Sequence, residues 1–168
     1  MPMVLVRISD WLTKTLMVLA ALWAFILCFF ILAEIVSRAI SMPLQGTKEI
    51  IANSVVMIVF LQLGFAVRSR SMLSADFLID ALPPAGRRIL VALGYVLGLV
   101  FFAILANAAI DPALRSFANG EFDGEGALRV PVWPARWMIV AGSALAAVNY
   151  LILAAVEILD LHVKEPAL

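Results

Sequence analysis

Glu34 and Arg38 are the charged residues whose spacing most clearly permits chemistry, because side chains at i and i+4 lie on one face of a helix and can form an ion pair. Glu34 lies within a long apolar stretch, about one turn from its far end, and an ionisable residue in such a stretch is a candidate for function. One carboxylate near the end of the stretch cannot form an ion pathway by itself. We therefore favour an ion pair that anchors the helix end or contacts a neighbouring subunit over a transport site.

Further polar side chains are scattered over the apolar stretches of the chain. They are Asn53, Ser54, Gln62, Tyr95, Asn107, Asn149 and Glu157. Each can take part in a hydrogen bond between helices, worth roughly 0.6–2 kcal/mol. A pore lined by the same residues is the alternative, but they form no charged ring. Gly94 and Gly98, four residues apart, also indicate close helix packing.

Cofactor chemistry needs groups that this sequence largely lacks. The only histidine, His162, follows the last apolar stretch, and the only cysteine, Cys28, lies inside the first. Haem, zinc and iron–sulfur sites need clustered imidazole or thiolate ligands, and no Gly-rich phosphate loop is present. We therefore expect no catalytic residues, no cofactor and no metal site, and a protein that is not an enzyme.

The composition places these residues in a membrane. Of 168 residues, 64% are hydrophobic and 14% are charged, and the mean hydropathy is +1.06, well above that of a soluble domain. The 12 Lys and Arg residues balance the 12 Asp and Glu residues, so no excess charge indicates binding to nucleic acid. The composition predicts an all-α integral membrane protein that contacts the lipid bilayer and forms a single membrane domain over residues 1–168.

Four apolar stretches are long enough to cross a hydrocarbon layer about 30 Å thick, which takes about 20 helical residues. They cover residues 15–37, 50–67, 89–110 and 137–159. We therefore expect four transmembrane helices. The second stretch is the shortest and should stand nearly upright.

Two shorter segments are predicted to be interfacial amphipathic helices. In residues 3–14, apolar side chains share one helical face and Arg7, Asp10 and Lys14 share the other, so the segment should lie along the membrane surface. Residues 72–82, between the second and third spans, are predicted to form the second such helix, which a Pro-Pro pair terminates.

Basic residues at the membrane ends indicate the orientation. Arg68, Arg70, Arg87 and Arg88 flank the connection between the second and third spans, which we therefore expect in the cytoplasm. A multi-pass protein of the bacterial cytoplasmic (inner) membrane with both termini cytoplasmic follows from this arrangement. The long connection at residues 111–136 is then outside.

Several short motifs keep a recognisable order along almost the whole chain. They are Glu34-x-x-x-Arg38 at the end of the first span, Gly46-Thr47-Lys48-Glu49 entering the second, Leu63-Gly64-Phe65-Ala66-Val67-Arg68 leaving it, Ala75-Asp76 and Leu82-Pro83 in the second interfacial segment, and Leu128-Arg129-Val130-Pro131-Val132-Trp133 before the fourth span. Together they resemble the small membrane subunit, the Q subunit, of tripartite ATP-independent periplasmic (TRAP) transporters. Family members often have a histidine after the basic residues that follow the second span, where this chain reads Arg70-Ser71-Met72-Leu73.

The resemblance implies a non-catalytic scaffold. In this family the small subunit is paired with, or fused to, a large multi-span permease subunit that holds the substrate and sodium sites, and a periplasmic solute-binding protein delivers small organic acids for symport. On this basis we expect candidates for subunit or helix-end interfaces at the following positions: Glu34, Arg38, Glu49, Gln62, Arg68, Arg70 and Asp76.

The outer connection at residues 111–136 combines acidic residues with aromatic residues and prolines, a mixture suited to a protein contact. The docking candidates are Glu121, Asp123, Glu125, Arg129 and Trp133. The alternative is a loop that is merely solvated.

Two functions from other classes remain as alternatives. The first is a self-assembling four-helix channel or holin-like pore, which only the scattered polar residues support. The second is the membrane anchor of a redox enzyme, against which the absence of histidines in the spans argues.

Overall fold

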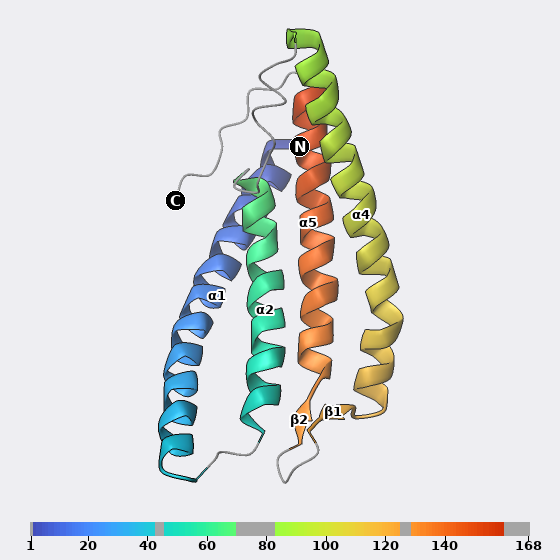
Figure 1. Cartoon of the computed structure of the whole chain (residues 1–168). Coiled ribbons are helices and arrows are strands. Elements are labelled where there is room, and N and C mark those ends of the chain that lie inside the picture. Colours follow the sequence, from blue (N-terminus) through green and yellow to red (C-terminus); the bar gives the residue numbers. More distant parts are fainter. Residues whose placement is uncertain (1, 43–45, 70–82, 125–128, 160–168) are drawn as a thin grey trace.

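The computed structural model describes residues 2–42, 46–69, 83–124 and 129–159 (Figure 1). Its elements are the helices α1 (Pro2–Ala39), α2 (Thr47–Arg68), α4 (Pro84–Ala118) and α5 (Trp133–Leu159), and the short strands β1 (Phe122–Asp123) and β2 (Val130–Pro131). The second predicted interfacial helix, residues 72–82, lies outside the described residues.

Each long helix is long and apolar enough to cross a membrane. The candidate spans are Ser9–Ala39, Thr47–Arg68, Gly86–Ala118 and Trp133–Glu157. The prediction of an all-α membrane protein with four transmembrane helices is therefore confirmed.

The four helices lie side by side in one row, in the order α1, α2, α5, α4 (Figure 1). Helix α5 packs extensively against both α2 and α4, whereas α1 packs mainly on α2 and touches α5 much less, in part through the Ser9–Asn149 hydrogen bond. The row therefore has two edges, formed by α1 and α4. At its N-terminal end α1 and α4 begin and α2 and α5 end, while the β-strands lie at the opposite end, which we call the hairpin end (Figure 1).

A heptad of buried residues on α1 and a glycine on α5 illustrate the close contacts within the row. Along α1, buried positions recur at Thr13, Ala20, Leu27 and Glu34, a heptad spacing that keeps one narrow seam facing a neighbouring helix. On α5, a Cβ atom added at Gly142 would lie 2.3 Å from the backbone oxygen of Phe60 on α2. Only glycine allows the two backbones to approach this closely.

The two glycines of the predicted Gly94–Gly98 pair have different surroundings. A Cβ atom at Gly98 would lie 2.6 Å from the ring of Tyr150, so this glycine lies in the contact between α4 and α5. Gly94 has nothing within 4 Å of the same position. Of these two glycines, only Gly98 contributes to close packing.

The N-terminal segment at residues 3–14 is helical, but it forms the first turns of α1 and is continuous with the first span. Neither Gly nor Pro occurs between residues 3 and 39, so nothing in the sequence interrupts the backbone hydrogen bonds. The hydroxyl of Thr13 donates to the carbonyl oxygen of Ser9 at 2.8 Å, and that of Thr15 donates to Trp11 at 2.9 Å. Both threonines therefore satisfy their polar groups within the helix.

The connection predicted at 111–136 is partly helical, since α4 continues to Ala118 and α5 already begins at Trp133. Pro112 lies inside α4 and does not end it. Gly120, the residue after the C-cap Asn119, has a left-handed φ of 59°. There the amides of Gly120 and Glu121 donate to the carbonyls of Phe117 (3.4 Å) and Ser116 (2.9 Å), which is a Schellman motif.

The remaining connection contains a small antiparallel hairpin. Strands β1 and β2 place Phe122 opposite Pro131 and Asp123 opposite Val130. The amide of Val132 also donates to the carbonyl of Glu121 at 3.1 Å. These bonds tie the hairpin to the ends of both α4 and α5.

Candidate functional site

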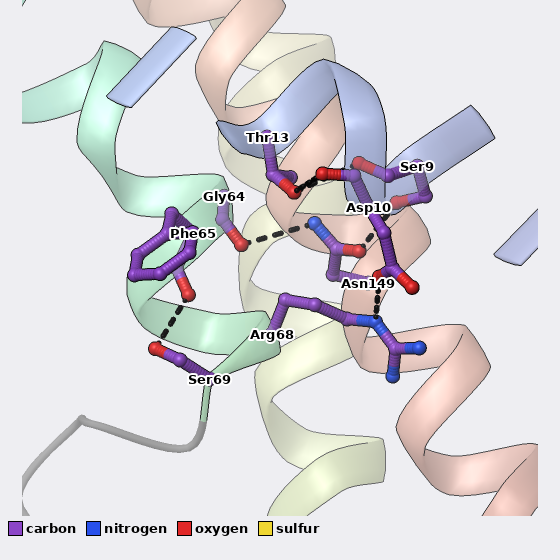
Figure 2. Close-up of polar contacts among 8 residues, drawn as sticks. All are labelled: Ser9, Asp10, Thr13, Gly64, Phe65, Arg68, Ser69 and Asn149. Atoms are coloured by element: carbon purple, nitrogen blue, oxygen red, sulfur yellow. Dashed lines mark hydrogen bonds and ion pairs between the residues drawn. The ribbon is translucent and has the colours of Figure 1, made fainter. Parts of the chain in front are cut away.

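A cluster of polar groups joins three helices near the N-terminal end of the row (Figure 2). We call it the polar cluster, and it contains Ser9, Asp10, Thr13, Gly64, Arg68 and Asn149. The first three residues come from α1, the next two from α2 and the last from α5. The cluster therefore fixes α1 to the rest of the row.

Asn149 connects the three helices of the polar cluster. It is fully buried, its Oδ1 accepts a hydrogen bond of 2.7 Å from the Ser9 hydroxyl, and its Nδ2 donates at 3.1 Å to the backbone oxygen of Gly64 (Figure 2). Gly64 also allows the close approach of the helices, since an added Cβ atom would lie 2.8 Å from Leu145 and 3.3 Å from Thr13. A larger residue at position 64 would require the Leu145 side chain or the helices themselves to shift.

Arg68 and Asp10 form the charged part of the polar cluster. Arg68 Nε donates to Asp10 Oδ1 at 2.7 Å, with 2% of the arginine side chain and 24% of the aspartate side chain exposed. A buried charge needs such a partner, because its desolvation is costly. The terminal nitrogen Nη2 of Arg68 is buried and has no hydrogen-bond partner among the described residues. Arg68 was predicted as an interface candidate, and in this structure its ion pair with Asp10 joins α2 to α1.

Glu34 and Arg38 form the i, i+4 ion pair near the hairpin end of α1. Arg38 Nε donates to Glu34 Oε1 at 3.0 Å, and the side chains of Glu34 and Arg38 are 11% and 53% exposed. The carboxylate is thus buried along the α1 seam while the guanidinium extends outward. Whether this pair takes part in a subunit contact stays a prediction.

The remaining interface candidates have less defined surroundings. Glu49 lies in the first turn of α2, where the helix dipole favours a carboxylate, and Gln62 is half-buried in the same helix. Arg70 and Asp76 lie outside the described residues.

Exposed aromatic side chains and an ion pair surround the hairpin. Glu121 and Arg136 pair at 2.7 Å, and the guanidinium carbon of Arg129 lies 4.5 Å above the centre of the Phe122 ring. The rings of Phe117 and Trp133 meet edge to face, with centroids 5.5 Å apart. We call the residues Phe117, Phe122, Arg129 and Trp133 the hairpin-end patch.

The docking candidates are thus only partly brought together. Glu121, Arg129 and Trp133 lie around the hairpin, and Asp123 is exposed in β1. Glu125 lies outside the described residues. The pairing of Glu121 with Arg136 was not predicted, because the two residues are separated in the sequence by a connection whose path the sequence does not give.

The polar cluster was also missed as a unit. Asn149 was expected to bridge helices, but its partners could not be named, and Asp10 was read as part of a surface-facing strip. The available signal was the occurrence of Ser9, Asp10 and Thr13 on one helical face, level with the basic end of the second span.

Among the described residues, Asn149 and Arg68 bond to residues of neighbouring helices, and no three His, Cys, Asp or Glu side chains are close enough to hold a metal ion. The fold and these contacts define a multi-pass membrane protein whose polar residues hold helices together. The family model for the DctQ component of tripartite ATP-independent periplasmic transporters matches residues 27–160. The chain belongs to this family and is a small permease component of a TRAP transporter. Comparisons with curated proteins and with solved structures gave no significant match.

Proposed function

We propose that this subunit is a non-catalytic scaffold for the large, ion-coupled permease subunit, in the bacterial cytoplasmic membrane with both termini in the cytoplasm. We further propose that its hairpin end helps to dock the periplasmic solute-binding protein during uptake of organic acids. The family supports a transporter composed of several components.

The observation that carries the scaffold proposal is the arrangement of the helices in a single open row (Figure 1). A coupled transporter holds its solute and ion near the membrane midplane between broken helices and convergent polar groups. Here Asn149, Ser9 and Gly64 satisfy one another between helices. An open row in which Asn149 bonds to neighbouring helices supports a scaffold over a four-helix channel.

The docking proposal rests on the hairpin end. The helix cap at Gly120 and the pairing of β1 with β2 fix the connection between α4 and α5. The large apolar side chains of the hairpin-end patch are exposed. Phe117 is 62% exposed and Trp133 is 38% exposed. Aromatic residues and arginine are the side chains enriched at the centres of protein interfaces.

Reconstitution into liposomes tests the scaffold role. Driven by a sodium gradient and supplied with the solute-binding protein, this subunit alone should give no uptake above empty liposomes, and adding the large subunit should restore uptake. The large subunit alone with the binding protein serves as the control for the contribution of the scaffold. Uptake by this subunit alone would contradict the proposal.

Charge reversal at Asp123 tests the docking role. Asp123 is exposed on β1 and makes no side-chain ion pair within the described ranges, so Asp123→Lys changes the surface charge without breaking the Glu121–Arg136 pair. We expect the binding-protein concentration for half-maximal uptake to rise about three- to tenfold, as for a charge change at an interface rim, with the maximal rate little changed. Lys48→Glu, on an exposed residue at the start of α2, is the matched control. An unchanged concentration dependence would rule out docking through Asp123.

A further inference from the structure

Asn107 is a polar side chain on the α4 edge of the row. It is exposed, and it makes no hydrogen bond to any residue in the part of the chain that the structure describes. A carboxamide carries two N–H donors and an oxygen acceptor, all of which water or another polar group must satisfy. Asn107 therefore differs from Asn149, whose carboxamide is fully buried and bonded on both sides.

Asn107 lies inside the uncharged part of α4. The nearest charged residues along the helix are Arg88 on one side and Asp111 on the other. Asn107 lies one turn before Asp111, roughly 6 Å along the helix axis. Because Cα–Cβ bonds tilt toward the N-terminus of a helix, its carboxamide is directed away from the Asp111 end and toward the middle of the span. Contact with water at the nearer boundary is therefore disfavoured.

The face around Asn107 points away from the other helices. Asn107 follows Gly98 by nine residues, which at 3.6 residues per turn places the two on opposite sides of α4, and Gly98 faces Tyr150 of α5. Val100 and Leu114 lie seven residues before and after Asn107, and they are 49% and 50% exposed. An apolar stripe of heptad spacing with one asparagine is the pattern of a helix that packs on another helix.

We propose that this face of α4 packs against a transmembrane helix of another component of the same transporter, and that Asn107 hydrogen-bonds to a polar side chain or a free carbonyl of that helix. We call the residues Val100, Ala103, Ile104, Asn107 and Leu114 the α4 edge face. The inference rests on the proposed function, because that function supplies the membrane partner.

The chemistry of the α4 edge face disfavours acyl chains as its sole neighbour. Acyl chains offer no hydrogen-bonding group, and a carboxamide left unbonded in hydrocarbon is costly. Ala103, one turn before Asn107, is small and exposed, so a partner backbone can approach the carboxamide closely. By contrast, the middle of the α1 edge exposes aliphatic and aromatic side chains such as Leu22 and Phe25, which lipid solvates well.

Photo-crosslinking in the assembled transporter tests the inference. A photoreactive residue replaces either Asn107 on the α4 edge or Phe25, 63% exposed on the α1 edge. The complex is isolated after irradiation. We expect an adduct with another transporter component from position 107 and markedly less from position 25. An adduct between two copies of this subunit, or partner adducts from position 25 alone, would overturn the inference.

Substitutions give a second, quantitative test. Asn107→Leu should weaken the affinity for the partner about three- to twentyfold, the range expected for one hydrogen bond between membrane helices. Phe101→Leu, on an exposed flank of the same helix, should leave the affinity unchanged. Equal affinities for Asn107→Leu and Phe101→Leu would also overturn the inference.

The outcomes separate this inference from the proposed function. If no transporter component copurifies with the unsubstituted subunit, the proposed function fails and the inference fails with it. If the complex forms but position 107 gives no partner adduct, the scaffold proposal stands and only the assignment of the α4 edge face fails.

Discussion

Asn149 on α5 and Asn107 on α4 are both asparagines, and they lie on helices that pack together. The first is buried and the second is exposed. Asn149 lies on α5, an inner helix of the row, and its two hydrogen bonds reach Ser9 on α1 and Gly64 on α2. Asn107 lies on the edge, exposed. The position of a helix in the row therefore decides whether an asparagine stabilises the subunit itself or is available to a partner.

The same contrast holds for glycines and for ion pairs. Gly142 lies against the backbone of α2, whereas Gly94 has open space around it. The pair Arg68–Asp10 is 2% and 24% exposed, whereas the pair Arg136–Glu121 at the hairpin end is 32% and 43% exposed. Each pair of like residues offers an experiment in which one member serves as the control for the other.

The largest effect is expected at Gly142. Gly142→Ala should lower the free energy of unfolding by about 3 kcal/mol, because the new Cβ atom overlaps a backbone oxygen that only a shift of a whole helix can move. Gly94→Ala, with nothing within 4 Å, should leave stability unchanged or raise it by up to about 1 kcal/mol. Unfolding in mixed detergent micelles measures both. Equal effects of the two substitutions would show that Gly142 does not lie at a close helix contact.

The ion pairs should show the next largest difference. Arg68→Met leaves the partly buried Asp10 carboxylate without its partner and should cost about 2–3 kcal/mol, somewhat less than for a fully buried pair. Glu121→Gln at the exposed pair should cost under about 1 kcal/mol. A double-mutant cycle that combines Arg68→Met with Asp10→Asn isolates the coupling energy. A coupling near zero would mean that Arg68 contributes through packing alone.

The two asparagines give the smallest difference in stability. Asn149→Leu leaves the Ser9 hydroxyl and the Gly64 carbonyl without partners, and we expect a loss of about 1–2 kcal/mol in the isolated subunit. Asn107→Leu should change the stability of the isolated subunit by less than about 0.5 kcal/mol, because the side chain is exposed. A large loss of stability at Asn107 would contradict its placement on the edge.

Much of the fold could be predicted because hydrophobicity and length suffice to define membrane helices. Every predicted span lies within one of the four observed helices. The end of α4 could not be placed, because Pro112 suggests a break that the helix does not make, and the capping hydrogen bonds at Gly120 end it instead. Residues 3–14 and the first span form one helix. The one sign of this in the sequence is the absence of Gly and Pro from residues 3–39.

Candidate residues were easier to predict than their partners. The Glu34–Arg38 pair is local, since an α-helix brings i and i+4 together in any fold. Arg68 and Asp10 are far apart in the sequence, and so are Asn149 and Ser9, so their contacts depend on which helices are neighbours. Similar apolar helices can be ordered in several ways within a membrane, because lipid solvates their surfaces about equally well.

The sequence by itself determined that this protein lies in a membrane, that it crosses it four times and, through its motifs, that it is a TRAP transporter small subunit. Backbone hydrogen bonding in a hydrocarbon layer imposes the helices, whatever their later packing. The order of the helices in an open row was decided only by the tertiary structure, through the close contact at Gly142 and the hydrogen bonds of Asn149. That order is why Asn149 is buried and Asn107 is exposed, since steric fit between helix surfaces, rather than hydrophobicity, selects the neighbours of each helix.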